Sequence, residues 1–334
     1  MSSINNQLGG RKLKFGLAIN EALRQLMEAD PSVFVIGQGV KSPWYVGNTC
    51  NGLIQEFGEA RVIDTPISEN AMSGVAAGAA MSGMKPVMNY PRLDFMFYAL
   101  DAIINGAANW RYMAGGSSNV PVVFWGIINR GGEQAAQHSQ AIQAIFAHAP
   151  GLKVVMPSNP YDAKGLLIAA VRDPDPVVFL DDRWVYGTEA EVPEELYEVA
   201  IGKGKILREG KDATIVAISY MVPQALEAAE ILEKEGISVE VIDPRTIKPL
   251  DMPLILESVK KTGRLVIAEA AWQSFGVSSE ISNRVYTEMF GKLLAPIEKV
   301  TLPDCPAPAS RSLEEVYYPK SGQIVAAVKK LVSA

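Results

Sequence analysis

The sequence contains few of the residues that bind metals or form cross-links. Its 334 residues include two cysteines, Cys50 and Cys305, and two histidines, His138 and His148. Two cysteines are too few for a disulfide framework or for a zinc site made of cysteines. With only two histidines, a histidine-rich metal site is excluded as well. This cysteine usage fits a reducing compartment.

Long apolar runs are also absent. The N-terminal stretch 1–16 lacks the apolar core of a signal peptide, so we expect a cytoplasmic protein. The most apolar small-residue stretch, 71–84, ends at Lys85 and Pro86, whereas a span of the bilayer needs about 20 apolar residues. We interpret 71–84 as a buried helix and expect no membrane-spanning segment.

The chain also lacks an excess of positive charge. The chain has 31 Lys and Arg against 37 Asp and Glu, a net charge of −6. An acidic chain without a basic run is poorly suited to nucleic-acid backbones or to anionic membrane surfaces. The sequence also lacks the glycine-rich phosphate loops and the HExxH, CxxC and GxSxG motifs of common enzyme families.

What the sequence does contain is a regular alternation of strand and helix patterns. Residues 15–30 have the spacing of an amphipathic helix, and 33–37 form a short, wholly apolar strand pattern. An acidic stretch, 186–198, carries a proline and no apolar period, and a second alternation begins at residue 213. The length also fits about two domains. We therefore predict an α/β protein with two doubly wound domains, 1–188 and 205–334, joined by a linker at 189–204.

The motif DTPISEN, residues 64–70, is a candidate functional site. A strand is predicted to end at Pro66, which places Glu69 in the first turn of the next helix. Open α/β sheets bind ligands at this end of their strands, and a carboxylate there can act as acid, base or hydrogen-bond anchor. The alternative is that Glu69 only stabilises the start of the helix through the helix dipole.

The polar loop 129–140 follows another predicted strand and contains His138. Histidine is the usual proton shuttle at neutral pH, although a hydrogen-bonded surface histidine is the alternative. His148 lies among apolar residues near a predicted helix end, and we interpret it as a structural histidine.

Three aromatic residues, Phe95, Phe97 and Tyr98, precede a helix predicted over 99–114. We expect two of the three to pack in the core. An aromatic side chain at this position can also form a flat wall against a heteroaromatic ring.

Several longer phrases follow one another along nearly the whole chain. They include RVIDTPISE, GVAAGAAMSGMKPV, AAQHSQ, HAPGLKVVMPSNPYDAKGLL and IDPRTIKPLD. In this order they resemble the β chain of the thiamine-diphosphate-dependent 2-oxoacid dehydrogenases, the E1 component of pyruvate, branched-chain-oxoacid and acetoin dehydrogenase complexes. The resemblance implies a pyrimidine-binding domain followed by a transketolase C-terminal-like domain.

The resemblance also implies a role for individual residues. Glu69 matches the glutamate that hydrogen-bonds the aminopyrimidine of thiamine diphosphate and promotes formation of the ylid. His138 matches a histidine at the mouth of the site that assists with substrate or with acylation of lipoate. Phe95 takes the place of the aromatic that stacks on the pyrimidine, and Ile67 would pack near the cofactor.

A potassium ion is implied by the same resemblance. The matching positions are Val122, Ala170, Asp173 and Asp175. The last of these is more often an amide side chain in the family.

The chain departs from the family pattern at three further positions. Gln38 stands where an acidic residue is usual, residues 89–91 read NYP in place of EFM, and Trp125 replaces an arginine. The loop that follows carries Arg130 and Glu133 instead. We expect these changes to lie on the wall of the cleft.

The sequence contains no GDG, which begins the motif that binds diphosphate and magnesium in thiamine enzymes. In two-gene members of the family this motif lies on the α chain. The resemblance therefore implies an α subunit as partner, an α2β2 heterotetramer, no activity of this chain alone, and a lipoyl acyltransferase (E2) as a further partner.

Three functions remain open at this point. The first is oxidative decarboxylation of a 2-oxoacid with acyl transfer to lipoyl. The second is a two-chain, transketolase-like carboligase that passes an activated aldehyde to a carbonyl acceptor without lipoate; an accompanying lipoyl acyltransferase would distinguish the two. The third is a non-catalytic scaffold, against which Glu69, His138 and Phe95 at matching spacing argue.

Overall fold

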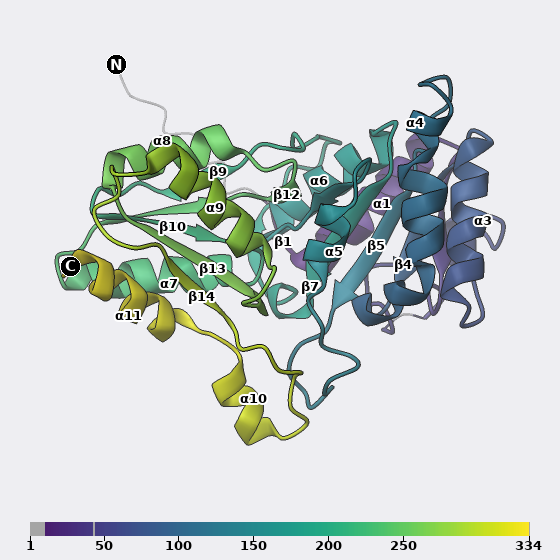
Figure 1. Ribbon diagram of the computed structural model, residues 1–334. Helices are drawn as coiled ribbons and strands as arrows, with labels where there is room; N and C mark the ends of the chain where they lie inside the picture. The colour runs from purple at the N-terminus through teal and green to yellow at the C-terminus, as the bar shows by residue number, and fades with distance from the viewer. Residues whose placement is uncertain (1–10, 43, 334) are drawn as a thin grey trace, which may run out of the picture.

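The computed structural model describes residues 11–42 and 44–333, which form two large β-sheets with helices on both faces (Figure 1) and a small two-stranded sheet. The first ten residues of the predicted first domain lie outside the described residues, as does most of the stretch that we searched for a signal peptide. Within the described ranges, no helix is both long enough and apolar enough to cross a membrane.

The first sheet has seven strands, and all of them are parallel except the one at the β12 edge. Its central strands are wholly buried, which explains why they read as continuous apolar runs. In spatial order the strands are β12 (Thr246–Lys248), β6 (Lys153–Val155), β7 (Val177–Asp182), β5 (Val123–Ile128), β4 (Lys85–Tyr90), β2 (Val33–Gly37) and β3 (Val62–Asp64).

Helices cover the two faces of this sheet. Helices α1 (Phe15–Ala29) and α6 (Pro160–Arg172) pack on one face with the valines of β2, β4 and β5. The opposite face is covered by α3 (Glu69–Met81), the 3₁₀-helix η1 (Leu93–Ala99), the π-helix η2 (Asp101–Ala108) and α5 (Gln143–His148). Shorter elements complete this half: α2 (Leu53–Phe57), α4 (Trp110–Met113) and η3 (Arg183–Val185).

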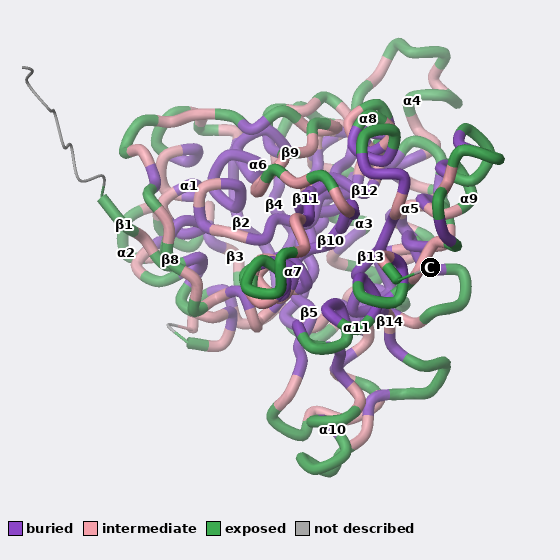
Figure 2. Tube along the Cα trace, turned by 90° about the vertical axis from the view of Figure 1, so that its left-hand side faces the viewer, coloured by how far each residue is buried: buried purple, intermediate pink, exposed green. Residues whose placement is uncertain are grey.

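The second sheet has five strands in the order β14 (Glu298–Leu302), β13 (Leu265–Trp272), β10 (Ala213–Ala217), β11 (Val239–Asp243) and β9 (Lys205–Arg208). Helices α7 (Met221–Lys234) and α11 (Ser321–Val332) pack on one face, and α8 (Met252–Thr262) and α9 (Val277–Met289) on the other. The short helix α10 (Arg311–Tyr317) projects from this half and is largely exposed (Figures 1 and 2). The two doubly wound sheets confirm the predicted fold class.

Two pairings tie the halves together more closely than a simple linker would. Strand β1 (Lys12–Lys14) pairs antiparallel with β8 (Glu189–Glu191), at the start of the predicted linker. Strand β12 follows β11 in the chain but pairs with β6, so the second half contributes an edge strand to the first sheet. The boundaries at 188 and 205 stay a prediction, since one strand crosses between the halves.

Two predicted helices differ in detail from the structure. The helix predicted to be buried over 71–84 is α3, which packs in the core through one face, formed by Ser73, Ala76, Ala77 and Ala80. The helix predicted over 99–114 begins as the π-helix η2 and continues as α4. A 3.6-residue period cannot reveal a π-helix, because the wider turn depends on local packing.

Candidate active site

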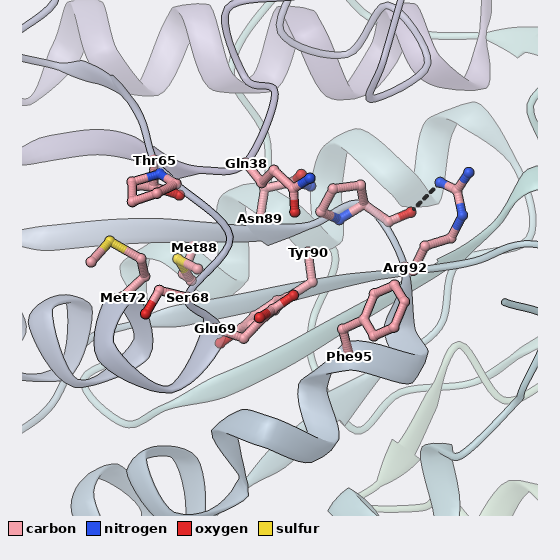
Figure 3. A pocket seen from close by; sticks show the side chains of 12 residues that line it. Gln38, Thr65, Ser68, Glu69, Met72, Met88, Asn89, Tyr90, Arg92 and Phe95 are labelled. Atoms are coloured by element: carbon pink, nitrogen blue, oxygen red, sulfur yellow. Dashed lines mark hydrogen bonds between the residues drawn. The ribbon is translucent and has the colours of Figure 1, made fainter. Parts of the chain in front are cut away.

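A pocket opens at the carboxyl ends of β2, β3 and β4, beside the start of α3. Figure 3 shows Met72 at one side of this pocket and Arg92 and Phe95 at the other. It is the end of the sheet at which parallel α/β proteins bind ligands. The lining residues are Gln38, Thr65, Pro66, Ser68, Glu69, Met72, Met88, Asn89, Tyr90, Pro91, Arg92 and Phe95.

Glu69 is the first residue of α3, and its side chain is half-buried in the pocket. Its backbone carbonyl accepts a hydrogen bond from the hydroxyl of Ser73, which also pairs with the hydroxyl of Tyr90. Burial raises the pKa of Tyr90, so this residue remains a neutral part of the wall. Within the described residues no hydrogen bond or ion pair engages the Glu69 carboxylate, which leaves it available to a ligand.

Phe95 and His138 meet although they are 43 residues apart in the chain. Their ring centroids lie 5.4 Å apart with the rings perpendicular. Phe95 lines the pocket from η1, and the loop of His138 is attached to the same helix because Asp94 accepts a hydrogen bond from the Gln140 amide at 3.0 Å. Burial raises the pKa of Asp94. Of the residues predicted from sequence, Glu69 and Phe95 therefore share one pocket, and His138 adjoins it.

Other predicted residues are more exposed than expected. Ile67 is 74% exposed, next to pocket residues Pro66 and Ser68. Phe97 is 40% exposed and Tyr98 is 71% exposed, so the expectation that two of the three aromatics pack in the core was wrong. His148 lies exposed in the last turn of α5, away from the residues that line the pocket, and its interpretation as a structural histidine stays a prediction.

Of the three departures from the family pattern, Gln38 and Asn89 line the pocket as expected. Trp125 does not: its side chain is fully buried, and its indole nitrogen donates a hydrogen bond to Asp181 at 2.9 Å. Its ring packs in the core between the sheet and helices α1 and α6, on the face of the sheet opposite to α3 and Glu69.

Arg130 is likewise not a pocket residue. It is buried and pairs with Asp182 at 2.5 Å, which anchors the start of the His138 loop to the end of β7. Farther along this loop, the backbone amide of Glu133 donates to the Glu314 carboxylate of α10 at 3.2 Å. The loop is therefore held from both halves of the chain.

Arg92 is a pocket residue that the sequence reasoning missed. Its guanidinium donates to the Pro91 carbonyl at 2.8 Å (Figure 3) and to the Gln134 side chain at 3.4 Å. Burial, helped by the nearby charge of Arg183, lowers the pKa of Arg92. Together with Glu69 it makes up the charged part of the pocket lining. The sequence did contain a signal for Arg92, because this arginine lies between the end of the predicted strand at Pro91 and the aromatic residue Phe95.

The four residues of the implied potassium site already have partners. Lys153 contacts both oxygens of Asp173 at 2.6 Å, and Arg111 contacts both oxygens of Asp175 at 2.8 and 2.9 Å. The carbonyls of Val122 and Ala170 accept backbone hydrogen bonds from Val177 and Asp173. Potassium binding stays a prediction, since an ion would have to compete with two cationic side chains for the carboxylates.

Comparison with known protein families matches the two halves separately. The transketolase pyrimidine-binding domain family matches residues 11–188, which contain the pocket, and the transketolase C-terminal domain family matches residues 202–324. The β subunit of acetoin:2,6-dichlorophenolindophenol oxidoreductase from Cupriavidus necator is 47% identical over 330 residues, covering 96% of this chain and 97% of that protein. The pyruvate dehydrogenase E1 β subunit from Rickettsia felis is 44% identical over 314 residues, covering 94% and 96%.

The chain belongs to this family of E1 β subunits. The resemblance drawn from the sequence phrases is thereby confirmed. Among solved structures, a split-gene transketolase described as an inactive β4 tetramer superposes with a TM-score of 0.79. It is 26% identical in sequence, with 96% of this chain and 98% of that chain covered.

Proposed function

We propose that this chain is the β subunit of a thiamine-diphosphate-dependent 2-oxoacid dehydrogenase that decarboxylates a 2-oxoacid and passes the acyl group to lipoyl. One observation carries the proposal: Glu69 and Phe95 line the same pocket, and His138 packs against Phe95 with 5.4 Å between the ring centroids. Two relatives of the chain are named as acetoin and pyruvate enzymes. These names support a substrate of the same class, a small molecule with a reactive 2-oxo or acyloin group.

The pocket fits a flat heteroaromatic ring with polar edges. Phe95 offers an aromatic wall, and Glu69 offers a carboxylate with no partner among the described residues. Thiamine diphosphate, when bound, supplies the nucleophilic carbon that attacks a 2-oxo group. These features support binding of its pyrimidine portion here.

Each residue then has a defined task. Glu69 holds a proton at a ring nitrogen of the pyrimidine, through a hydrogen bond that is strengthened because the half-buried site contains less water than bulk solvent. Phe95 orients the ring by stacking. His138 moves a proton at the substrate or at the acyl acceptor, a role that suits its half-exposed position beside Phe95.

The second half of the site would come from an α subunit. Support comes from the exposed small-residue face of α3, formed by Ala71, Gly74, Val75 and Gly78, and from the exposed aromatic Tyr98. An added Cβ at Gly74 or Gly78 would meet no other atom within 4 Å, so a partner helix can approach closely there. We place the diphosphate and magnesium on the α subunit, in an α2β2 heterotetramer, because the GDG motif is absent from this sequence.

A two-chain transketolase-like carboligase is the second candidate. It is supported by the likeness to the split-gene transketolase, with its TM-score of 0.79 over nearly the whole chain. The two functions share Glu69 and differ in the acceptor, which is lipoyl in one and a carbonyl compound in the other. A cytoplasmic location and an E2 partner stay predictions.

The decisive experiment is purification with the α subunit, followed by assays of 2-oxoacids and acetoin with an artificial electron acceptor, a lipoyl acyltransferase or an aldehyde. We expect activity in the first two assays and none from this chain alone. Carboligation without lipoyl transfer would favour the second candidate. No activity with any acceptor would favour the scaffold interpretation.

Cofactor binding by the isolated chain provides a separate check. We expect weak binding of thiamine diphosphate in calorimetry, because the chain would hold only the pyrimidine half of the molecule. Tight, magnesium-dependent binding by this chain alone would contradict the shared site.

A further inference from the structure

The short helix α10 buries a charged side chain instead of an apolar one. Of its seven residues, all within the described part of the chain, Glu314 is the one that is buried, at 6% exposed. Leu313 and Val316 on the same helix are 58% and 79% exposed. Helices usually pack through an apolar face, because burial of a carboxylate is costly unless it is hydrogen-bonded. A buried glutamate in such a helix therefore points to a specific partner.

The partner of Glu314 is the polar loop that carries His138. Both oxygens of the Glu314 carboxylate accept from the backbone amide of Glu133 at 3.2 Å. Tyr318, which follows α10, lies against the same loop, with its ring centroid 5.8 Å from the guanidinium carbon of Arg130. The C-terminal half of the chain thus contacts this loop of the first half directly.

The loop has a backbone conformation that its own residues do not favour. Glu133 and Ala135 have φ angles of 61° and 58°, in the left-handed region that residues with a Cβ rarely adopt. Such conformations persist where the surrounding structure holds them. Hydrogen bonds attach the loop to three residues outside it, Glu314, Asp94 and Arg92. The bond to Glu314 acts directly on a strained residue.

The strained part of the loop leads directly to His138. The His138 amide donates to the Ala135 carbonyl at 3.5 Å, which closes a turn between them. The His138 ring lies edge-on to Phe95 with 5.4 Å between the ring centroids, and Phe95 lines the pocket. A change of the backbone at Glu133 would therefore be passed through the turn to the His138 ring.

We propose that Glu314 is a positioning residue for His138, because it fixes the Glu133 amide and thereby holds the loop in the conformation that sets the His138 ring against Phe95. Glu314 is not among the residues that line the pocket, so it acts through the loop. The task of His138 in catalysis rests on the proposed function, whereas the contact between Glu314 and the loop does not.

NMR of the full chain tests the positioning without any assay of activity. The chain contains two histidines, so isotope-labelled histidine gives the signals of His138 and His148 alone. The His138 ring signals are shifted by the neighbouring Phe95 ring, and we expect Glu314→Ala to change them. The signals of His148, exposed on α5, should stay in place. Glu314→Gln keeps an oxygen that can accept from the Glu133 amide and should retain the wild-type signals.

A kinetic test uses the complex with the α subunit. We expect Glu314→Ala to lower kcat for acyl transfer to lipoyl about 10-fold, because His138 is misplaced but not removed. The KM for the 2-oxoacid and the exchange of the thiamine C2 proton, which depends on Glu69, should stay near their wild-type values. In a His138→Ala background, Glu314→Ala should cause no further loss, since both substitutions act through the same group.

Glu315 provides a matched control on the same helix. It is the next residue, its side chain is 63% exposed, and its ion pair is with Arg311. Glu315→Ala should therefore leave the His138 signals and the rate of acyl transfer unchanged.

Unchanged His138 signals in Glu314→Ala would overturn the proposal, as would losses that add in the double variant. A chain that no longer folds, or a lower urea denaturation midpoint together with slower C2 exchange, would also overturn it, because Glu314 would then be a structural residue. Changed His138 signals with wild-type acyl transfer would support the positioning of the loop and overturn the proposed task of His138 instead.

Discussion

A buried hydrogen-bond network in the second half of the chain differs from the open pocket in the first half. In the second half, Thr214 of β10 pairs with the hydroxyls of Ser258 and Thr262 at 2.7 and 2.8 Å. Glu269 of β13 accepts from the Gln143 side chain at 2.9 Å and from the amides of Val277 and Ser278. These hydrogen bonds hold the fold together, because the buried groups that form them exchange bonds to water for bonds within the protein.

At the pocket of the first half, the polar groups are left open. The Asn89 amide has no partner among the described residues, one oxygen of Asp94 has none there, and the Glu69 carboxylate is not engaged within that part of the chain. A carboxylate without a partner adds nothing to the stability of the fold, so the open Glu69 carboxylate in the pocket indicates a role in binding. The comparison separates a buried network that stabilises the fold from a pocket that is open to a ligand.

The largest expected effect tests whether the pocket is the functional site. Glu69→Gln should slow exchange of the thiamine C2 proton by about 10²–10⁴-fold in the complex with the α subunit, because a proton-holding group is lost. The denaturation midpoint should hardly change. NMR measurement of the exchange rate checks this, with Glu56→Gln, a first-turn glutamate of α2, as control. A wild-type exchange rate would reduce Glu69 to a helix-start residue.

The next largest effect tests whether the buried hydrogen-bond network of the second half stabilises the fold. Glu269→Ala should lower the free energy of unfolding by about 3 kcal/mol, since three donors lose a buried charged acceptor. Urea denaturation of the full chain measures this change. Glu280→Ala, at an exposed position on α9, should have a much smaller effect. Equal effects of the two substitutions would contradict the scaffold role of Glu269.

His138 lies where the two regions meet, and its substitution should separate two steps. We expect His138→Ala to reduce acyl transfer to lipoyl by about 10²-fold, the lower end for a lost acid–base group, and to reduce turnover with an artificial oxidant less. Parallel assays of the two reactions check this, with the exposed His148→Ala as control. Equal losses would assign His138 to substrate binding or to the first chemical step.

A smaller effect concerns Asp181, a buried residue of β7. Burial raises the pKa of its carboxyl to about 7, although Trp125 and Tyr186 hydrogen-bond to it. In the unfolded chain the pKa of this carboxyl is about 3.9. Between about pH 4 and pH 7 the carboxyl is therefore protonated in the folded state and ionised in the unfolded state. The stability from this proton is complete below about pH 4 and is lost as the pH rises through 7.

Asp181→Asn mimics the protonated carboxyl at every pH. The wild-type chain should therefore lose stability relative to this variant as the pH rises from about 4 to 7, and the difference should level off above that range. Urea denaturation at a series of pH values measures the difference. A difference that does not change with pH would show that Asp181 is already ionised in the fold.

The smallest effect concerns an exposed ion pair, and it gives a baseline for the changes in the free energy of unfolding. Arg311 and Glu315 form an exposed pair along α10 at 3.7 Å, with side chains 83% and 63% exposed. Glu315→Gln should change the free energy of unfolding by less than about 0.5 kcal/mol, because water and salt screen such pairs. A larger change would mean that α10 contributes more to the fold than its exposure indicates.

The sequence by itself determined the local elements and the family. Helix α1 and strand β2 lie almost where their patterns predicted, since an apolar period of 3.6 or a short apolar run is a property of neighbouring residues. Helix α8 begins at Met252, after the capping side chain of Asp251, which is also a local signal. Strand β3 ends at Asp64, just before Pro66, and Glu69 begins α3 as predicted, so the candidacy of Glu69 for the site was local too.

Tertiary structure alone decided which distant residues meet. The contact of Phe95 with His138 depends on the bond from Gln140 to Asp94, and the crossing of β12 to β6 depends on strand register. No local pattern shows that Trp125 is fully buried against Asp181, or that the Asn89 amide finds no partner among the described residues. The physical reason is that burial and hydrogen bonding depend on segments far apart in the chain, whose approach is set by packing rather than by periodicity.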